Sequence, residues 1–187
     1  MQLLDLPSVD LDVALTIPSG YSFAVGFVDF LHERDVSTGS VGKVAANPEQ
    51  SKHLETGTTR IMGLECDFVG LRSETYTDSR IPDQVQLGTP EEDALRRDLT
   101  INSLFYNVHT REVEDYTKKG LEDLENKVAR TPLPPKQTFE DDPLRVLRCV
   151  RFASRFDLSV ADEVTEAIKM PEIQVRRPGR YKDEAYS

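Results

Sequence analysis

Apolar and polar residues alternate along the opening stretch of the chain, residues 9–17. The apolar positions are Leu11, Val13, Leu15 and Ile17, and they alternate with Asp10, Asp12, Ala14 and Thr16. This period of two predicts a strand whose apolar side chains face a core. Asp10 and Asp12 would then project from the opposite face, about 7 Å apart along the strand.

A second strand-like pattern covers residues 58–72. There Asp67 shares one face with Glu65, Val69 and Leu71, and the other face carries Leu64, Cys66, Phe68 and Gly70. Residues 35–50 and 73–88 are polar and predict connections. Residues 108–116 predict a short hairpin, and a helical or turn segment begins at Gly120.

Three segments have helix signals. Ser19 and Gly20 offer a cap for a helical pattern over residues 21–34, and the capping-box sequence at residues 89–92 predicts a helix reaching about Tyr106. Asp142 and Pro143 open a third helix that reaches about Phe156.

Composition excludes some classes of protein. Charge content of 30% and hydrophobic content of 38% over 187 residues are typical of a globular protein, and no apolar run has membrane-spanning length. A net charge of −10 argues against bulk adhesion to nucleic acid or to an anionic membrane, but permits a local basic surface. Cys66 and Cys149 lie in apolar stretches, which favours reduced packing residues in an intracellular protein over a disulfide or metal pair. Cytoplasm, nucleus and mitochondrion stay open.

Asp10, Asp12 and Asp67 are candidates for one metal site. Two acids on one strand face repel each other unless a cation lies between them, and oxygen ligands suit Mg²⁺. A solvated strand face is the alternative for Asp10 and Asp12, and a salt bridge to Arg60 or Arg72 is the alternative for Asp67. Taken together, the three acids suggest a two-metal centre for phosphoryl or nucleotidyl transfer.

Two arginine-rich segments could bind a nucleotide. Arg96 and Arg97 suit triphosphate oxygens, although a salt-bridged surface helix would explain them equally. Downstream, four arginines spaced 3, 3 and 4 residues apart predict a stripe on one helix face beside a broad apolar side; the arginines are Arg145, Arg148, Arg151 and Arg155, and the apolar residues are Leu144, Leu147, Val150 and Phe156. Asp142 either caps this helix or accepts a hydrogen bond from a base amino group, with Arg145 donating to the adjacent ring atom. Cytosine and adenine match that pattern, and both roles are compatible.

The chain resembles the class II tRNA nucleotidyltransferases (CCA-adding enzymes) of the poly(A) polymerase head family, in their eukaryotic form. The likeness runs over roughly residues 7–170 and rests on five motifs in order, at residues 10–15, 67–72, 92–102, 115–124 and 141–156. The resemblance implies an α+β fold, with a nucleotidyltransferase-like mixed sheet of about four strands and flanking helices. We expect a head at 1–135, a helical neck at 136–170 and a poorly ordered tail at 171–187.

The resemblance also implies residue roles. Asp10 and Asp12 would hold Mg²⁺ with Asp67 as a third catalytic acid, Arg96 and Arg97 would lie at the nucleotide, and Asp142 and Arg145 would select the base. Arg148 and Arg151 would be further nucleotide contacts. The implied reaction adds C, C and A to the tRNA 3′ end from CTP and ATP without a template, and no membrane is involved.

Two features of the family lie outside this sequence. The Gly-Gly-containing turn that precedes the first motif is absent, and so are the helical regions that grip tRNA. We therefore expect a head-plus-neck piece, truncated at both ends. The alternatives are an inactive nucleotide-binding fragment and a related poly(A) polymerase specific for ATP.

Overall fold

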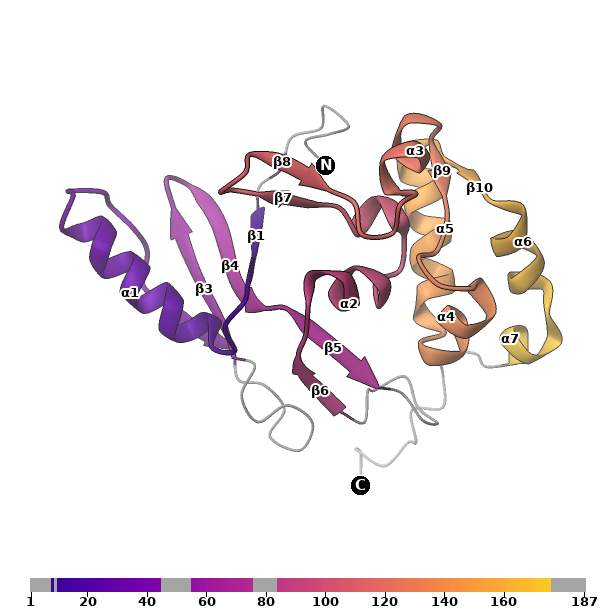
Figure 1. The fold of residues 1–187 in the computed structure, drawn as a ribbon, viewed down its shortest axis with the longest axis horizontal. Coiled ribbons are helices and arrows are strands. Elements are labelled where there is room, and N and C mark those ends of the chain that lie inside the picture. The colour runs from indigo at the N-terminus through magenta and orange to yellow at the C-terminus, as the bar shows by residue number, and fades with distance from the viewer. Residues whose placement is uncertain (1–7, 9, 45–54, 76–83, 176–187) are drawn as a thin grey trace, which may run out of the picture. The chain divides into compact units, whose positions relative to one another are not determined.

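The computed structural model describes residues 8, 10–44, 55–75 and 84–175 of the chain (Figure 1). The chain divides into two compact units. The first comprises residues 1–75 and 83–89, and the second comprises residues 76–82 and 90–187.

The first unit is built on a mixed four-stranded sheet. The strands are β1 (Asp10–Leu15), β2 (Gly42–Val44), β3 (Thr56–Ile61) and β4 (Leu64–Gly70), in the order β1-β4-β3-β2. β1 runs parallel to β4, whereas the β4–β3 and β3–β2 pairs are antiparallel. The predicted α+β class with a small mixed sheet is confirmed.

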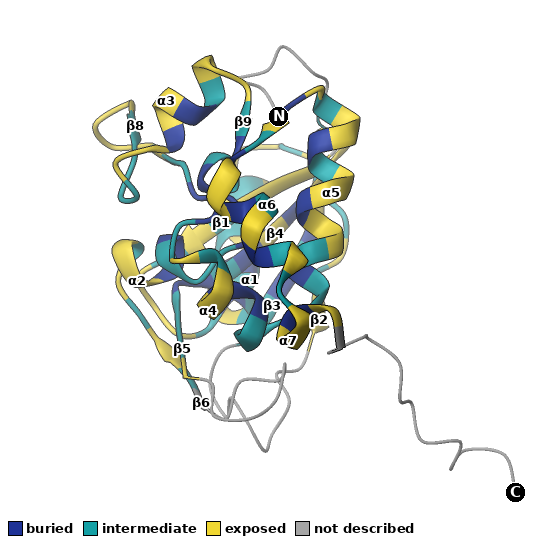
Figure 2. Cartoon of the chain, turned by 90° about the vertical axis from the view of Figure 1, so that its right-hand side faces the viewer, coloured by how far each residue is buried: buried dark blue, intermediate teal, exposed yellow. Residues whose placement is uncertain are grey.

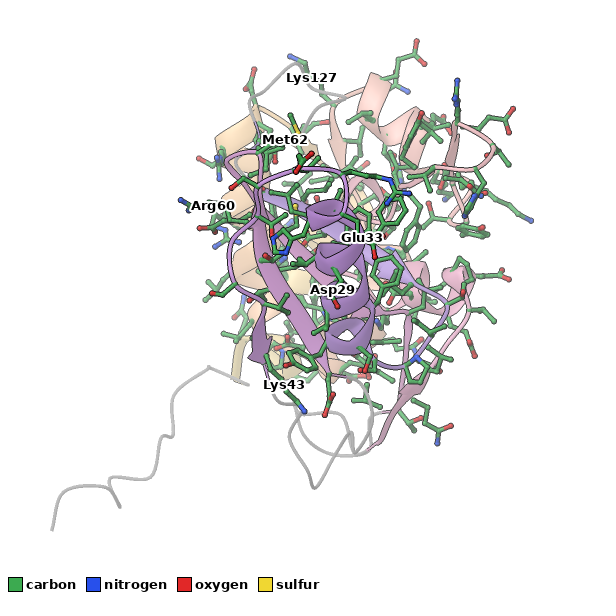
Figure 3. All side chains as sticks on the ribbon, turned by 90° about the vertical axis from the view of Figure 1, so that its left-hand side faces the viewer. Asp29, Glu33, Lys43, Arg60, Met62 and Lys127 are labelled. Carbon is green, nitrogen blue, oxygen red and sulfur yellow. The ribbon has the colours of Figure 1, made fainter. Side chains whose placement is uncertain are left out.

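Helix α1 (Gly20–His32) packs against β3 and β4, with Asp29 and Glu33 on its outer side (Figure 3). Ser19 caps it as predicted, because its hydroxyl accepts a hydrogen bond from the Ser22 N–H. The Phe23 ring lies 5.3 Å from the ring of Phe68 on β4. Glycine is required at position 20, since a Cβ there would lie 1.9 Å from the Phe68 carbonyl oxygen.

The segment 58–72, predicted as one strand, is instead a hairpin followed by a further strand. Met62 and Gly63 form the turn between β3 and β4, with φ of 51° and 86°, and Figure 3 shows Met62 at its tip. Positive φ at both central residues is the geometry that two-residue hairpins prefer. The sequence conceals this turn because methionine is not a residue that signals positive φ.

Strands also occur in the two predicted connections. β2 lies within residues 35–50, and β5 (Arg72–Thr75) pairs antiparallel with β6 (Gln84–Leu87). The prediction of strandless connections was therefore wrong. On β1 only Val13 and Leu15 join the core, because Leu11 is exposed and Ile17 lies beyond the end of the strand.

The second unit is mainly helical. Its helices are α2 (Pro90–Leu95), α3 (Gly120–Glu125), α4 (Pro135–Asp141), α5 (Leu144–Phe156), α6 (Asp162–Lys169) and α7 (Pro171–Val175), and its short strands are β7 (Phe105–Asn107), β8 (Glu112–Glu114), β9 (Val128–Ala129) and β10 (Ser159–Val160). Leu99, Phe139, Cys149 and Val164 are fully buried in its core. The predicted hairpin and the helices at Gly120 and Leu144 are confirmed.

The predicted helix from residue 90 to about Tyr106 was wrong. α2 ends at Leu95, Leu99 has an extended backbone, and Thr100–Asn102 form a single 3₁₀ turn. Short polar side chains compete with the helix for backbone hydrogen bonds here, because the Asp98 carboxylate accepts from the Leu99 N–H and the Ser103 hydroxyl donates to the carbonyls of Ala94 and Leu99.

The apolar side predicted for α5 coincides only in part with its buried side. Its buried residues are Arg145, Cys149 and Ala153, whereas Leu147 and Val150 are 57% and 51% exposed. Figure 2 shows buried and exposed positions alternating along this helix. The small side chains of Cys149 and Ala153 let the helix approach the core closely, Val146, Phe152 and Phe156 also pack against the core, and Leu147 and Val150 lie outside.

The boundaries of the predicted regions are described only in part. α7 occupies Pro171–Val175, inside the segment expected to be poorly ordered, and residues 176–187 lie outside the described part. The head–neck boundary near residue 135 stays a prediction. Among the described residues, no helix is both long enough and apolar enough to cross a bilayer.

Candidate active site

Asp10 and Asp12 on β1 and Asp67 on β4 lie on the sheet face opposite α1. In the parallel register Asp12 lies opposite Asp67, and Asp10 lies opposite Glu65. Cys66 and Phe68, which alternate with these acids on β4, are buried in the core beneath α1. The register therefore brings together the three acids that were predicted to act jointly.

The surroundings of Asp67 make its carboxyl harder to ionise. Partial desolvation raises the pKa of the Asp67 carboxyl, and the carboxylates of Asp12, Glu65 and Asp10 raise it further. Arg60, one of its two candidate partners, pairs instead with Glu65 at 2.7 Å. Within the described residues, Asp12 and Asp67 have no hydrogen-bond donor or ion-pair partner.

This donor set fits a hard divalent cation, because it offers carboxylate oxygens on an exposed face and a charge that a cation would relieve. Among the described residues, no group of three or more His, Cys, Asp or Glu side chains could by itself hold a metal ion. Asp10 and Asp12 would therefore supply only part of a coordination shell. Mg²⁺ typically binds through one or two carboxylates, with waters and substrate phosphates completing the shell.

A pocket of about 280 Å³ lies in the second unit. It is lined by Arg96, Arg97, Asp98, Asn102, Asp142, Arg145 and Arg148. The two arginine-rich segments singled out in the sequence thus converge on one concave, strongly charged site. Arg151 does not line it.

Asp93 holds the two adjacent arginines in place. Its nearly buried carboxylate accepts from Arg96 Nη2 at 3.0 Å and from Arg97 Nε and Nη2 at 2.9 and 2.8 Å. Arg97 Nη1 also donates to the Asn102 carbonyl at 2.9 Å, and its guanidinium lies over the Phe105 ring. Sequence reasoning missed Asp93, although its spacing of three and four residues from the arginines is a usable signal.

Asp98 joins the two walls of the pocket. Its side chain is 5% exposed and accepts three hydrogen bonds, from the Leu99 N–H at 2.9 Å, Asn102 Nδ2 at 3.0 Å and Arg148 Nε at 2.6 Å. Asp98 and Asn102 meet across a 3₁₀ turn, not along a helix face. With its oxygens engaged, Asp98 orients Arg148.

Asp142 and Arg145 form the other wall. Asp142 Oδ1 accepts from the Leu144 N–H at 2.9 Å, so this residue does cap the start of α5. Its Oδ2 has no partner among the described residues. Arg145 is only 7% exposed. Burial raises the pKa of the nearby Asp141 carboxyl, and the charge of Arg145 offsets part of that rise.

Both cysteines are buried and free, as predicted. Cys149 lies on α5, where burial and the Asp98 carboxylate raise the pKa of its thiol and the charges of Arg148 and Arg145 lower it, with a net value of about 12. A thiol so protonated and enclosed is a packing residue.

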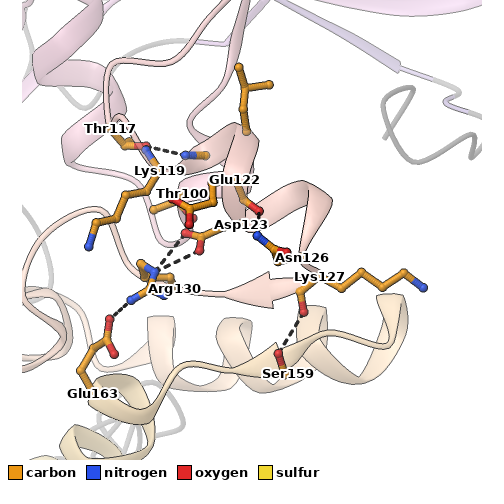
Figure 4. A network of polar contacts seen from close by, with 12 residues as sticks. Thr100, Thr117, Lys119, Glu122, Asp123, Asn126, Lys127, Arg130, Ser159 and Glu163 are labelled. Atoms are coloured by element: carbon orange, nitrogen blue, oxygen red, sulfur yellow. Dashed lines mark hydrogen bonds and ion pairs between the residues drawn. The ribbon is translucent and has the colours of Figure 1, made fainter.

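A buried network supports the segment that carries Arg96 and Arg97 (Figure 4). The Asp123 carboxylate accepts from the Thr100 hydroxyl at 2.7 Å and from Arg130 Nε at 3.0 Å. Thr100 N–H donates to the Arg130 carbonyl, and Arg130 also pairs with Glu163 on α6. This network anchors the 3₁₀ turn to α3 and α6, which gives the fourth motif of the sequence a structural role.

The chain is similar in sequence to a known family of proteins. A family model described as "Poly A polymerase head domain" matches residues 2–130. The mitochondrial CCA tRNA nucleotidyltransferase of Saccharomyces cerevisiae is 55% identical over 179 residues, covering 93% of this chain and 33% of the relative. This chain thus spans about a third of that relative's length.

The fold of the chain is also similar to solved structures of such enzymes. A CCA-adding enzyme in an apo form superposes with a TM-score of 0.68 at 26% identity, over 89% of this chain and 37% of that one. A tRNA nucleotidyltransferase complexed with a primer tRNA and an incoming ATP analog gives a TM-score of 0.61 at 25% identity, over 89% and 42%. The predicted resemblance is confirmed, and the chain belongs to the poly A polymerase head domain family.

Proposed function

We propose that this chain is the catalytic part of a tRNA nucleotidyltransferase, which transfers CMP and AMP from CTP and ATP to a tRNA 3′ end. The observation that carries the proposal is the convergence of the two arginine-rich segments, residues 96–102 and 142–148, on one pocket. The relative and the structure named above, a CCA tRNA nucleotidyltransferase and a complex with primer tRNA and an ATP analog, support this substrate class.

The pocket wall formed by Asp142 and Arg145 would read the base. Oδ1 of Asp142 accepts the hydrogen bond of the helix cap, which leaves Oδ2 to accept from an exocyclic amino group. Arg145 would donate to the ring nitrogen or carbonyl beside that amino group. Cytosine and adenine both present a donor beside an acceptor, whereas uracil and guanine do not present this pair to the same wall.

The other arginines would bind the phosphates. Arg96 and Arg97 are held by Asp93, and Arg148 is held by Asp98, so their guanidinium groups are oriented before a ligand arrives. Such preorganisation lowers the entropic cost of binding. Arg151 lies outside the pocket, and we leave it out of the nucleotide site.

Asp10 and Asp12 would hold Mg²⁺, with Asp67 as the third acid. When bound, the ion would neutralise charge on the phosphates and make the attacking 3′-hydroxyl more acidic. Asp67, whose pKa is raised, could accept the hydroxyl proton. The 3′ oxygen would attack the α-phosphorus of CTP or ATP, and pyrophosphate would leave. We further propose an intracellular site of action, since the yeast relative is named as mitochondrial.

The reaction is tested by incubating the purified chain with Mg²⁺, radiolabelled CTP and a tRNA that ends at the discriminator base. Incorporation of C, followed by A when ATP is added, is the expected result. Binding of CTP without incorporation would identify an inactive nucleotide-binding fragment. Incorporation of A alone would identify a poly(A) polymerase.

A further inference from the structure

We propose that Arg151 and Arg155, on the outer side of α5, bind the phosphates of the last nucleotides of the RNA primer. The inference rests on the proposed function and extends it to the path of the RNA. These two arginines continue the predicted stripe but take no part in the pocket.

The charge on α5 is unusual for this chain. The helix carries four arginines and no acidic residue, although the chain has a net charge of −10. Arg151 and Arg155 are both exposed, and like charges four residues apart on a helix repel each other. An anion bound between them would relieve that repulsion.

Neither arginine is neutralised within the described part of the chain. In that part of the chain they contact aromatic rings: the Arg151 guanidinium lies 5.2 Å from the Phe152 ring centroid, and that of Arg155 lies 5.3 Å from the Phe156 centroid. The two rings stack at 5.7 Å. By contrast, Lys169 on α6 pairs with Glu166 at 3.0 Å. The phenyl rings therefore limit where the guanidinium groups can lie, while leaving their N–H groups available to an anion.

The order of the arginines along α5 gives the direction of the proposed RNA path. Arg145 is buried at the pocket, Arg148 lines it while 47% exposed, and Arg151 and Arg155 follow on the outside. From Arg145 to Arg155 the helix axis rises about 15 Å. A primer whose 3′-hydroxyl reaches a nucleotide in the pocket must lead its preceding phosphates away from it, and this stripe offers them positive charge along one such path.

The test is the salt dependence of RNA binding. An RNA hairpin with a single-stranded 3′ overhang is titrated against the 187-residue chain and the double variant Arg151→Ala/Arg155→Ala over a range of KCl concentrations. Loss of two phosphate contacts should weaken binding and flatten the slope of log K against log salt by about 1.4 to 1.8. The Arg151→Lys/Arg155→Lys variant should keep the slope, because lysine retains the charge. Lys169→Ala is the matched control and should behave as the wild type.

Binding of CTP, measured in parallel, separates the possible failures. The inference requires CTP affinity to be unchanged in the double alanine variant. An unchanged RNA slope would overturn the inference, and so would a parallel loss of CTP affinity, which would return these arginines to the nucleotide. A wild-type chain that binds CTP but not RNA would also overturn it. A chain that binds neither would overturn the proposed function itself.

Discussion

Arg148 on α5 donates from Nε to Oδ2 of Asp98 over 2.6 Å, joining two segments that are 50 residues apart in the sequence. Asp98 also accepts from Asn102 and from the Leu99 N–H, so one nearly buried carboxylate fixes both walls of the pocket. The arginine motif after α2 and the arginine motif of α5 are therefore one site, with Asp98 as the junction.

Replacing Asp98 should test that junction. Asp98→Ala leaves the Asn102 amide, the Leu99 N–H and the Arg148 Nε without their acceptor, and should lower the free energy of unfolding by about 2–3 kcal/mol in urea titrations. Arg148→Ala should cost less, about 1 kcal/mol, because the arginine is half exposed and Asp98 keeps two donors. Equal effects of the two substitutions would contradict the assignment of Asp98 as the shared acceptor.

Asp123 should be as important to stability as a core residue. Asp123→Ala removes the buried acceptor of Thr100 and Arg130, and should lower the free energy of unfolding by about 2–3 kcal/mol. Glu163→Gln, at the exposed end of the same network, should change it by less than about 1 kcal/mol. Thermal and urea unfolding measure both, and a larger loss from the glutamate change would show that the network is anchored elsewhere.

Asp67 should make the fold more stable in mild acid. Its pKa is raised in the folded chain, so between its unfolded and folded values the folded state binds more protons than the unfolded state. Its contribution to stability therefore falls as the pH rises through that window. Compared with wild type, Asp67→Asn should gain stability at neutral pH and lose this part of the pH dependence. If the stability of the two proteins depends on pH in the same way, the pKa of Asp67 is not raised in the folded chain.

Mg²⁺ should relieve the same repulsion. Millimolar Mg²⁺ should raise the unfolding temperature of the wild type at neutral pH, because a ligand bound only by the folded state stabilises it by mass action. Asp12→Asn should abolish this increase, whereas Asp29→Asn, an exposed acid on α1, should retain it. An increase that persists in Asp12→Asn would remove Asp12 from the metal site.

The two thiols should resist alkylation in the folded chain. Cys66 and Cys149 are both buried with raised pKa values, that of Cys149 reaching about 12, so little thiolate exists at pH 8. Mass spectrometry after treatment with iodoacetamide should show slow modification of the native protein and rapid modification of both thiols in urea. Rapid modification of the folded protein would indicate local opening near either residue.

The sequence predicted the elements with clear periodicity. The alternation around Asp12 and Asp67 predicted which side chains share a sheet face, and the pairing register then made these two acids neighbours, which no local pattern could specify. Ser19 was recognisable as a cap because its chemistry is local. The Met62–Gly63 turn escaped notice because one of its two residues adopts positive φ without the usual sequence signal.

Side-chain contacts that leave no periodic pattern in the sequence account for the features that were not predicted. The end of α2 at Leu95 is determined by hydrogen bonds of Asp98 and Ser103, which outweigh the helix propensity of the segment. The exposure of Leu147 and Val150 could not be read from α5 alone, because its amphipathic pattern does not say that Cys149 and Ala153 form the buried side. The resemblance to a family supplied roles for residues, whereas the structure supplied Asp93 and Asp123, which support them.

Base selection by Asp142 tests the account most directly. Asp142→Asn keeps an oxygen for the Leu144 N–H, so the cap of α5 survives, but it replaces the second carboxylate oxygen with a donor. Equilibrium binding of CTP, ATP, UTP and GTP to wild type and variant is the measurement. We predict that the wild type prefers CTP and ATP by about 1–3 kcal/mol, and that Asp142→Asn loses this preference and gains affinity for UTP. An equal affinity of the wild type for all four nucleotides, or an unchanged preference in Asp142→Asn, would contradict the account.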